Sequence, residues 1–596
     1  MKFTIEFQPA GLRLILDEPT TLLDAIRQAG ISLRSDCGGK GICGKCVVQL
    51  LSCIGNNPPG IIENSQLDAK QISEGYRLAC ETIVNKDLKV FVPQDSVIEG
   101  QVLQVEGRYR VISANPVISQ KTVELEEANL NDLLSDFTRI NASVDHQNIT
   151  ADLNVIRKIP ELLRNNQWQI NLIIKAKEII NVTPQPLEKL VGLAVDVGST
   201  KLACYLVDLQ SGMTIAARGT SNPQIAFGED IMARLAYAME SPAKAEHLHR
   251  MLFEAINQTT RDLCEQSEVP QSEITDAVLV GNTAMHHFFL NLPVSALAVS
   301  PFVPAFSDPV CAPAKDLGLA AMPGCAVYAP AVIAGFIGSD HLAFLMAEGF
   351  GDDNRVRLGI DIGTNTEIAL QKGGRIVSVS TASGPAFEGA HIQFGMRAAP
   401  GAIEHVTFGA DGKVQIQVIG EKAPTGICGS GILDAVAEMR RVGLLNSRGR
   451  MDKQFPGVGL DDMGKPFFKL SEGEKTITMS QNDVDQILLA KGAIRAGIDV
   501  LMNYLKVSPP EIENVVIAGA FGTYMLPEQA MRIGMLPEIA LDRVQSVGNA
   551  AGAGARMMLA SSASRKKAEA LARRVEYLEL TIYPEFLMFY ARGTQA

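Results

Sequence analysis

Three cysteines lie close together in the segment CGGKGICGKC, which covers residues 37–46. Two kinds of chemistry fit this segment. A G-x-x-x-x-G-K spacing that starts at Gly39 is most of a phosphate-binding loop, in which backbone N–H groups hold a nucleotide. Cys37, Cys43 and Cys46 have the spacing C-x5-C-x2-C, which suits thiolate ligands of an iron–sulfur cluster.

The nucleotide interpretation of this segment is the weaker one. Cys46 follows Lys45 at the position where a phosphate-binding loop needs a Ser or Thr hydroxyl for magnesium. The preceding residues, ISLRSD, are too polar for the buried strand that such a loop follows. The next residues, VVQLLSC, are partly β-branched and favour a strand over the long helix that should begin there.

A fourth thiol supports the cluster. Cys80 follows Cys46 after 33 residues, in the segment RLAC. This set resembles that of plant-type [2Fe–2S] ferredoxins, which have C-x4-C-x2-C and a distant fourth Cys; the x5 variant is similar to the adrenodoxin-like branch. The order of expected elements, a hairpin, a helix over TTLLDAIRQAG, the cysteine loop and later strands, also resembles such a ferredoxin. The resemblance implies a β-grasp ferredoxin domain over residues 1–93, with a [2Fe–2S] cluster on Cys37, Cys43, Cys46 and Cys80.

The glycines, the alternative metal and the remaining cysteine of this region also bear on the cluster prediction. Gly38, Gly39, Gly41 and Gly44 would let the loop wrap closely and direct backbone N–H groups at the sulfur atoms. Zinc is the alternative metal, but the x5 spacing and the glycine-rich loop fit it poorly. Cys53 lies outside the pattern, so we expect it to be no ligand.

Length and composition indicate several ordinary globular domains. A chain of 596 residues suggests three or four domains, and 46% hydrophobic with 20% charged residues is typical of globular proteins. A net charge of −12 argues against nucleic acid or an anionic membrane as partner. The sequence contains no apolar run of about 18 residues, so we expect no membrane span. The N-terminus lacks a signal-peptide pattern, and ten cysteines then indicate a reducing compartment, so we expect a cytoplasmic protein.

The polar residues 94–113 predict a linker, and residues 114–187 predict a small α/β middle domain. In this domain we expect helices over residues 129–140 and 152–166, with strands before and after them. Nothing in it carries recognisable chemistry.

The segment that begins at Leu190 contains one pattern twice. LVGLAVDVGSTKLACYLVDLQSG holds an apolar strand, a polar turn with Asp and Gly, and a second apolar strand, and RLGIDIGTNTEIALQKGG repeats this order about 165 residues later. Asp196 and Asp361 at the strand ends suit magnesium or its waters. Gly198 and Gly363 would let the backbone approach a phosphate. Polar hydrogens for phosphate oxygens would come from Ser199, Thr200, Thr364 and Asn365.

These two turns resemble the phosphate-1 and phosphate-2 loops of the actin, Hsp70 and sugar-kinase (ASKHA) superfamily. ENVVIAGAFGTYM takes the place of its adenosine motif, where Gly519 and Gly522 would let adenine or ribose lie against backbone. The helix start GNAAGAGARMML could close on the same site. In SGPAFEGAHIQFG, Glu388 and His391 either line the cleft or belong to a surface loop.

This resemblance implies a two-lobed ATPase domain over residues 188–596 that binds ATP with Mg²⁺. The lobes would cover about residues 188–356 and 357–596. Together with the N-terminal module, the expected fold is multidomain, α+β and α/β, with a β-grasp ferredoxin domain, a small α/β middle domain and an ASKHA-type ATPase domain.

Nearly the whole chain resembles the reductive activators of corrinoid proteins, often called RACo-type, in segments such as CGGKGICGKC, DVGST, SNPQIAFGEDIMARL, DIGTNTEI and GICGSGILD. The resemblance implies an ATP-dependent reductase. It would transfer one electron from its [2Fe–2S] cluster to the inactive Co(II) corrinoid of a methyltransferase or corrinoid protein and regenerate Co(I). An upstream electron donor is implied as a second partner, and a homodimer is compatible with the sequence.

Three alternatives stay open. The chain could activate another low-potential enzyme, as the 2-hydroxyacyl-CoA dehydratase activators do, although their cluster cysteines lie inside the ATPase domain. It could be a small-molecule kinase with a ferredoxin module. It could also use ATP only as a conformational clamp.

Overall fold

The computed structural model of the chain describes most of its 596 residues. The described residues are 3–8, 12–29, 33, 35, 37, 39–51, 58–93, 96, 114–144, 148–228, 230–409, 413–473 and 475–595. Cys53 and the predicted linker over residues 94–113, apart from Ser96, lie outside the described residues. Within the described part, no helix is both long enough and apolar enough to cross a bilayer.

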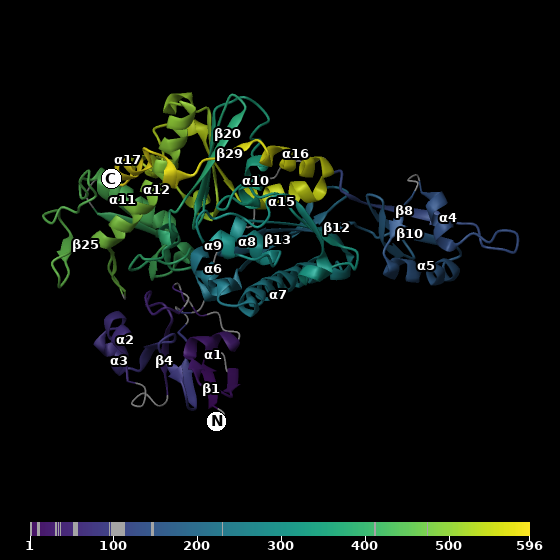
Figure 1. Cartoon of the computed structure of the whole chain (residues 1–596). Coiled ribbons are helices and arrows are strands. Elements are labelled where there is room, and N and C mark those ends of the chain that lie inside the picture. Colours follow the sequence, from purple (N-terminus) through teal and green to yellow (C-terminus); the bar gives the residue numbers. More distant parts are fainter. Residues whose placement is uncertain are drawn as a thin grey trace.

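The N-terminal domain is built on a five-stranded sheet with the strand order β2-β1-β7-β4-β5 (Figure 1, purple). Apolar and polar residues alternate in its first strand, FTIEFQ, and the apolar ones are buried. The buried side chains of α1 belong to the same core as the sheet. This arrangement confirms the predicted β-grasp fold. Its elements are β1 (Phe3–Gln8), β2 (Leu12–Leu16), β3 (Thr20–Thr21), α1 (Leu22–Gln28), β4 (Val47–Leu50), α2 (Ile61–Gln66), α3 (Ala69–Ser73), β5 (Tyr76–Leu78), β6 (Ile83–Val84) and β7 (Leu88–Phe91).

A middle unit follows, with a four-stranded sheet in the order β8-β10-β11-β9 and two helices. The helix predicted over residues 129–140 was wrong at its start. Ser135 caps it by accepting a hydrogen bond of 3.2 Å from the backbone N–H of Thr138, so the helix begins at Asp136. The elements are β8 (Ile118–Glu124), α4 (Asp136–Ser143), β9 (Thr150–Ala151), α5 (Leu153–Asn165), β10 (Gln169–Lys175) and β11 (Glu178–Thr183).

The middle unit is packed against the part of the chain that follows it. Ile118, Ile173 and Ile180 belong to one continuous apolar core with the strands that begin at residue 191. A Cβ on Gly324 would lie 2.2 Å from the carbonyl oxygen of Ile180, so the two backbones approach each other closely there. The unit is therefore fixed to this part and extends sideways from it (Figure 1, blue).

The remaining chain contains two six-stranded sheets that share one connectivity in five of their strands and differ in the sixth. The first has the order β14-β13-β12-β15-β17-β16, and the second β28-β27-β18-β19-β20-β29. In both, the first three strands form an antiparallel meander, and the next two lie parallel to the first. The repeat seen in the sequence is thus a repeat of topology, and it confirms the two-lobed ASKHA-type architecture.

Helices cover both faces of the first lobe's sheet, because α7 packs on β13 and β14 while α10 and α15 pack near β12 and β15. The elements between residues 191 and 347 are β12 (Val191–Val197), β13 (Lys201–Asp208), β14 (Thr214–Ser221), α6 (Ile231–Met239), α7 (Pro242–Ser267), β15 (Ile274–Gly281), α8 (Thr283–Phe289), α9 (Ser295–Ala298), β16 (Val310–Pro313), β17 (Ala326–Ala329) and α10 (Ser339–Ala347).

The second lobe has α12 against β19 and β20, and α17 against α12. Two helices from this end of the chain, α15 and α16, pack on the first lobe, after which β29 returns to pair with β20. The remaining elements are β18 (Arg357–Ile362), β19 (Thr366–Lys372), β20 (Arg375–Thr381), β21 (Ala402–Phe408), β22 (Val414–Val418), β23 (Gly426–Ile427), α11 (Gly429–Arg441), β24 (Val458–Leu460), β25 (Pro466–Ser471), β26 (Ile477–Ser480), α12 (Gln481–Leu505), β27 (Asn514–Ala518), α13 (Ala520–Tyr524), α14 (Pro527–Arg532), β28 (Val544–Gly548), α15 (Ala550–Ala560), α16 (Ser562–Ala572), β29 (Val575–Tyr577) and α17 (Phe586–Gly593).

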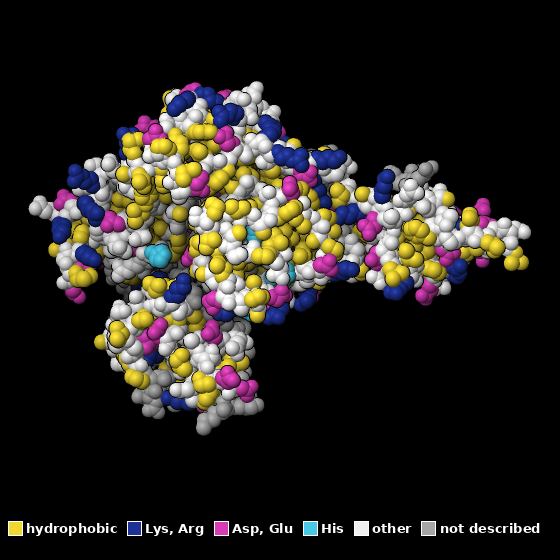
Figure 2. All heavy atoms as spheres, viewed as in Figure 1, with side chains coloured by type: hydrophobic (Ala, Val, Ile, Leu, Met, Phe, Trp, Pro, Cys, Tyr) yellow, Lys and Arg dark blue, Asp and Glu magenta, His cyan; other side chains and the backbone are white. Residues whose placement is uncertain are grey.

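Figure 2 shows acidic and basic side chains mixed with hydrophobic and neutral ones over the visible face. The N-terminal domain and the middle unit appear there as separate bodies beside the two lobes.

Candidate functional site

The four cysteines of the predicted cluster meet in two pairs. The Sγ atoms of Cys37 and Cys43 lie 3.4 Å apart, and so do those of Cys46 and Cys80. The second pair is buried and the first is half-buried. Two thiolates on one tetrahedral metal ion, each at about 2.3 Å, are roughly 3.8 Å apart. Each pair therefore fits one iron of a binuclear cluster.

A single metal ion fits this arrangement less well. In the part of the chain that the structure describes, no three His, Cys, Asp or Glu side chains are grouped so as to hold one ion. A structural zinc would need four ligands around one point. The hydrogen bond shared within each pair lowers the pKa of Cys37 and of Cys46 and raises the pKa of Cys43 and of Cys80, so one sulfur of each pair ionises more readily than the other. The geometry favours a [2Fe–2S] cluster over zinc.

The loop that carries three of these cysteines turns at glycines. Gly41 has φ +72° and Gly44 has φ +64°, a region that other residues rarely adopt. A Cβ on Gly41 would also lie 2.6 Å from Oε1 of Glu81. These two glycines are therefore needed for the path of the loop between Cys37 and Cys46.

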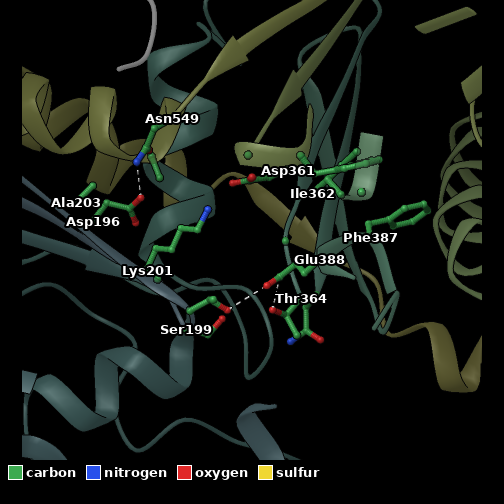
Figure 3. A pocket seen from close by; sticks show the side chains of 18 of the residues that line it. Asp196, Ser199, Lys201, Ala203, Asp361, Ile362, Thr364, Phe387, Glu388 and Asn549 are labelled. Carbon is green, nitrogen blue, oxygen red and sulfur yellow. Dashed lines mark hydrogen bonds between the residues drawn. The ribbon is translucent and has the colours of Figure 1, made fainter. Parts of the chain in front are cut away.

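A cavity of about 260 Å³ is lined by residues of both lobes. The turns between β12 and β13 and between β18 and β19 contribute its polar wall (Figure 3). All of the predicted nucleotide-contacting residues except Gly522 line it: Asp196, Gly198, Ser199, Thr200, Asp361, Gly363, Thr364, Asn365 and Gly519.

The two glycines of the GAFG segment have different surroundings. Gly519 lies between β27 and α13 with φ +90°, and a Cβ there would be 2.3 Å from the carbonyl oxygen of Ile362. Gly522 lies on α13, where a Cβ would come within 2.6 Å of the side chain of Ile517. Gly519 therefore forms part of the cavity wall, whereas close packing of α13 on β27 accounts for glycine at position 522.

Five carboxyl groups line the cavity: Asp196, Asp361 and Glu388, which the sequence analysis named, and Asp340 and Glu367, which it did not. Burial raises the pKa of Asp196 to about 6, and burial together with the charge of Asp196 raises that of Asp361 to about 7. Burial, and then Asp361 and Asp196, raise the pKa of Asp340 to about 8. Burial, followed by Asp340 and Asp361, also raises the pKa of Glu367. Such a group of mutually repelling carboxylates attracts a divalent cation, and Mg²⁺ is usually held by one or two carboxylates, waters and phosphates.

Asn549 fixes the first of these carboxylates. Its Oδ1 accepts a hydrogen bond of 2.6 Å from the N–H of Gly552 and so caps α15, while its Nδ2 donates to Oδ2 of Asp196 at 2.7 Å (Figure 3). The N-terminus of α15 contributes Ala550 and Ala551 to the cavity wall. A helix N-terminus carries partial positive charge and suits a bound anion. This supports the prediction that the helix start at residue 548 closes on the site.

Glu388 reaches into the cavity from the second lobe and contacts the turns of both lobes. Its carboxylate accepts a hydrogen bond of 2.8 Å from the hydroxyl of Thr364 and a weaker one of 3.4 Å from Thr200 (Figure 3). Lys201 also lines the cavity, and burial lowers its pKa, against the opposing effect of Glu388. His391 does not line the cavity and is exposed. Glu388 therefore lines the cleft, whereas His391 belongs to the surface loop.

Sequence reasoning missed Asp340, Glu367 and Lys201. Glu367 pairs directly with Asp361 across the β18–β19 hairpin, so both side chains lie on one face of the sheet. The hairpin register could have identified Glu367. Lys201 directly follows Thr200, so its position beside the predicted turn could have identified it. Asp340 stands at the start of α10 in no motif, so only the fold brings it to the cavity.

Models of known families match consecutive parts of the chain. Residues 6–85 match the 2Fe–2S iron–sulfur cluster binding domain, and 107–189 match the RACo linker region. Residues 191–353 match the RACo middle region, and 355–595 the C-terminal domain of RACo, the ASKHA domain.

Relatives with a described role match over most of their length. The chain is 31% identical over 600 residues to the corrinoid activation enzyme RamQ of Eubacterium limosum, covering 97% of this chain and 96% of the relative. It is 27% identical over 431 residues to the [Co(II) methylated amine-specific corrinoid protein] reductase of Methanosarcina barkeri, covering 67% of this chain and 76% of that one.

A solved structure matches the whole architecture. It is described as a reductive activator for corrinoid, iron-sulfur protein, with a TM-score of 0.74 and 30% identity, covering 100% of this chain and 98% of that chain. With its paired cysteines, its two-lobed cavity and these matches, the chain belongs to the RACo family, the reductive activators of corrinoid proteins.

Proposed function

We propose that this protein is an ATP-dependent reductive activator, which passes one electron to the Co(II) corrinoid of a partner protein and so regenerates Co(I). The observation that carries the proposal is the presence, in one chain, of four cysteines in two pairs and of a separate two-lobed cavity. The relatives of known role that combine these parts act, by their names, on corrinoid proteins.

The electron-carrying site would be Cys37, Cys43, Cys46 and Cys80. A bound [2Fe–2S] cluster supplies a one-electron carrier of low potential, about −400 mV in plant-type ferredoxins. The protein's contribution is to hold the sulfur atoms 3.4 Å apart in each pair and to bury Cys46 and Cys80 in the core of the N-terminal domain. This burial keeps water away from two of the four ligands, and exposure to solvent is one of the factors that set a cluster's potential.

The cavity would bind ATP with Mg²⁺. Asp196 and Asp361 are placed to hold the cation directly or through its waters. Burial raises the pKa of both carboxyl groups, and the charge of Asp196 adds to the effect on Asp361, so a cation would stabilise their charged forms. The hydroxyls of Thr200 and Thr364 and the backbone at Gly198 and Gly363 would contact the phosphates. Gly519 follows β27, and adenine or ribose would lie against its backbone.

In this proposal the chain has four parts. We propose a ferredoxin domain over residues 1–93, a linker over 94–113, a middle domain over 114–187 and an ATPase domain over 188–596. Separate buried cores support it, because one core draws its residues from Phe3 to Val92 and another from Val123 to Val182.

Nucleotide binding can promote the electron transfer only by favouring one conformation of the protein over another. A ligand shifts an equilibrium only as far as it binds one state better than another. In this protein both lobes contribute to the cavity, so a nucleotide that contacts both would favour one lobe arrangement. We propose that this arrangement is the one that binds the Co(II) corrinoid protein or releases it after the transfer. A separate electron donor and a homodimer complete the proposed assembly.

The decisive experiment mixes the reduced protein with a Co(II) corrinoid protein and follows the visible spectrum with and without ATP. ATP-dependent loss of the Co(II) absorption with growth of Co(I) absorption is expected. A phosphorylated small molecule without any change at cobalt would instead identify a kinase. Tight nucleotide binding without electron transfer to any cobalt acceptor would identify a conformational clamp.

A further inference from the structure

Glu388 joins the two phosphate loops across the cavity. Oε1 of its carboxylate accepts a hydrogen bond of 2.8 Å from Thr364 in the second lobe, and Oε2 accepts one of 3.4 Å from Thr200 in the first lobe. Both threonines are buried, so water competes little for these hydroxyls. One acidic side chain thus takes hydrogen bonds from the same hydroxyls that the proposed nucleotide site assigns to phosphate (Figure 3).

The segment that carries Glu388 is held in place by tight packing. Glu388 ends a short 3-10 helix, Pro385–Glu388, and Gly389 follows with φ +86°. A Cβ on Gly389 would lie 2.7 Å from the backbone nitrogen of Met396. Phe387 stacks on Phe521 of α13, with ring centroids 4.7 Å apart and an angle of 24° between the rings. The backbone on both sides of Glu388 is therefore held firmly, while its carboxylate reaches into the cavity.

A carboxylate and a phosphoryl group cannot share these donors. A threonine hydroxyl has one hydrogen to donate, so each hydroxyl can serve Glu388 or a phosphate oxygen, and not both at full strength. The two acceptors are also both anionic, and like charges brought together in a low-dielectric site repel each other. A phosphoryl group between the loops must therefore displace the carboxylate.

Two basic side chains line the same cavity as Glu388. Lys201 and Arg397 line the same cavity, and the charge of Glu388 acts on Lys201 in opposition to that of Arg397. If the carboxylate of Glu388 exchanged its two hydroxyl donors for these cations, the Pro385–Glu388 helix would move. The stack of Phe387 on Phe521 would then be strained.

We propose that Glu388 is a specificity-determining residue of the nucleotide site, because its carboxylate holds the place of the terminal phosphoryl group of ATP. The proposal rests on the proposed ATP site. ADP, which lacks this group, leaves the bridge between Thr200 and Thr364 in place, whereas ATP must break it. Glu388 therefore weakens the binding of ATP relative to ADP, and it makes the segment around Phe387 respond to the terminal phosphate.

The test measures binding to the full-length protein with Mg²⁺, by calorimetry, of ADP and of a non-hydrolysable ATP analogue. Glu388→Gln keeps the size of the side chain and removes its charge. We expect it to bind the ATP analogue about tenfold more tightly and ADP within about twofold of the unchanged protein. Glu404→Gln, on β21 and outside the cavity lining, is the matched control and should change neither.

A second variant separates this role from general damage. Thr364→Val removes the donor and should weaken the ATP analogue, opposite in sign to Glu388→Gln. If Glu388→Gln leaves ATP binding unchanged or weaker, or strengthens both nucleotides equally, Glu388 does not hold the place of the terminal phosphate. A fall in turnover at unchanged affinity would mean that Glu388 orients the attacking water, and it would also overturn the proposal. If the unchanged protein and all variants bind no nucleotide, the proposed ATP site itself is wrong.

Discussion

Asn549 donates a hydrogen bond from its side-chain amide to the carboxylate of Asp196, over a distance of 2.7 Å. The two residues are 353 positions apart in the sequence, and the contact ties the N-terminus of α15 to the first phosphate loop. One side chain therefore serves both as a helix cap and as the group that orients a cavity carboxylate.

Asn549→Ala should have two measurable effects. Loss of the cap should lower the free energy of unfolding by about 1 kcal/mol. Magnesium–nucleotide binding, measured by calorimetry, should weaken as well, because Asp196 loses its hydrogen bond. Ser561→Ala is the matched control, since Ser561 caps α16 and does not line the cavity. Equal nucleotide binding by both variants would contradict the role of Asn549.

Asp361→Asn should weaken nucleotide binding at least about tenfold, because a carboxylate next to the cation contributes charge that an amide lacks. The visible spectrum of the cluster should stay unchanged, since Cys46 and Cys80 belong to the separate core of the N-terminal domain. Asp485→Asn, on the surface of α12, is the control. An unaltered affinity for ATP and ADP in Asp361→Asn would exclude Asp361 from the cation site.

Cys46→Ser should weaken or abolish the cluster, because Cys46 is buried and its sulfur lies 3.4 Å from that of Cys80. Iron and sulfide analysis of anaerobically purified protein measures this, with two of each expected per chain. Cys53→Ser, at a position outside the described residues and outside the ligand pattern, should keep the cluster. Zinc in place of iron in the unchanged protein would refute the assignment.

Lys491 should make stability depend on pH. Its side chain is 1% exposed on α12, and burial, with Arg495 and Arg440, lowers its pKa to about 7. In the unfolded chain the pKa is about 10.4, so between these values the unfolded state binds a proton that the folded state does not. The stability of the second lobe should therefore rise as the pH increases from about 7 to about 10.

Lys491→Met should remove this dependence, as followed by the calorimetric unfolding transition of the two-lobed part. Lys465→Met, which replaces an exposed lysine of the same lobe, should retain it. The same pH dependence in both variants would show that another group is responsible.

A fragment without residues 1–93 should still bind ATP and the Co(II) corrinoid protein, because the cores of the two lobes are formed, among the described residues, by side chains from Ile118 onward. It should not reduce cobalt. The isolated N-terminal domain should accept electrons and fail to deliver them at a useful rate. Recognition of the corrinoid protein by the N-terminal domain alone would reverse this division of roles.

Patterns local in the sequence predicted most of the fold. The alternation in FTIEFQ, the cysteine spacing and the repeated strand–turn–strand pattern each depend on neighbouring residues, and the structure shows the corresponding sheet, sulfur pairs and lobes. The resemblance to known families then supplied the architecture that no local pattern contains.

Features that depend on tertiary contacts were not predictable in this way. Asp340 becomes a cavity residue only because α10 packs between the lobes, and nothing near it in the sequence indicates this. Gly522 was predicted to contact the nucleotide, but a glycine fits its position because Ile517 lies against it. The helix predicted from residue 129 begins at Asp136, because the cap at Ser135 outweighs the apolar pattern before it.

The return of α15 and α16 to the first lobe means that the backbone connects the lobes three times: after α10, after β28 and after α16. A protease that cut the chain once, in the connection near residues 352–353, would leave two pieces, and α15 and α16 of the C-terminal piece would still be packed on the first lobe. The nicked protein should therefore elute as one species without denaturant. The same threefold connection keeps the two lobes together on either side of the cavity, because the first lobe contains chain from both sides of β18.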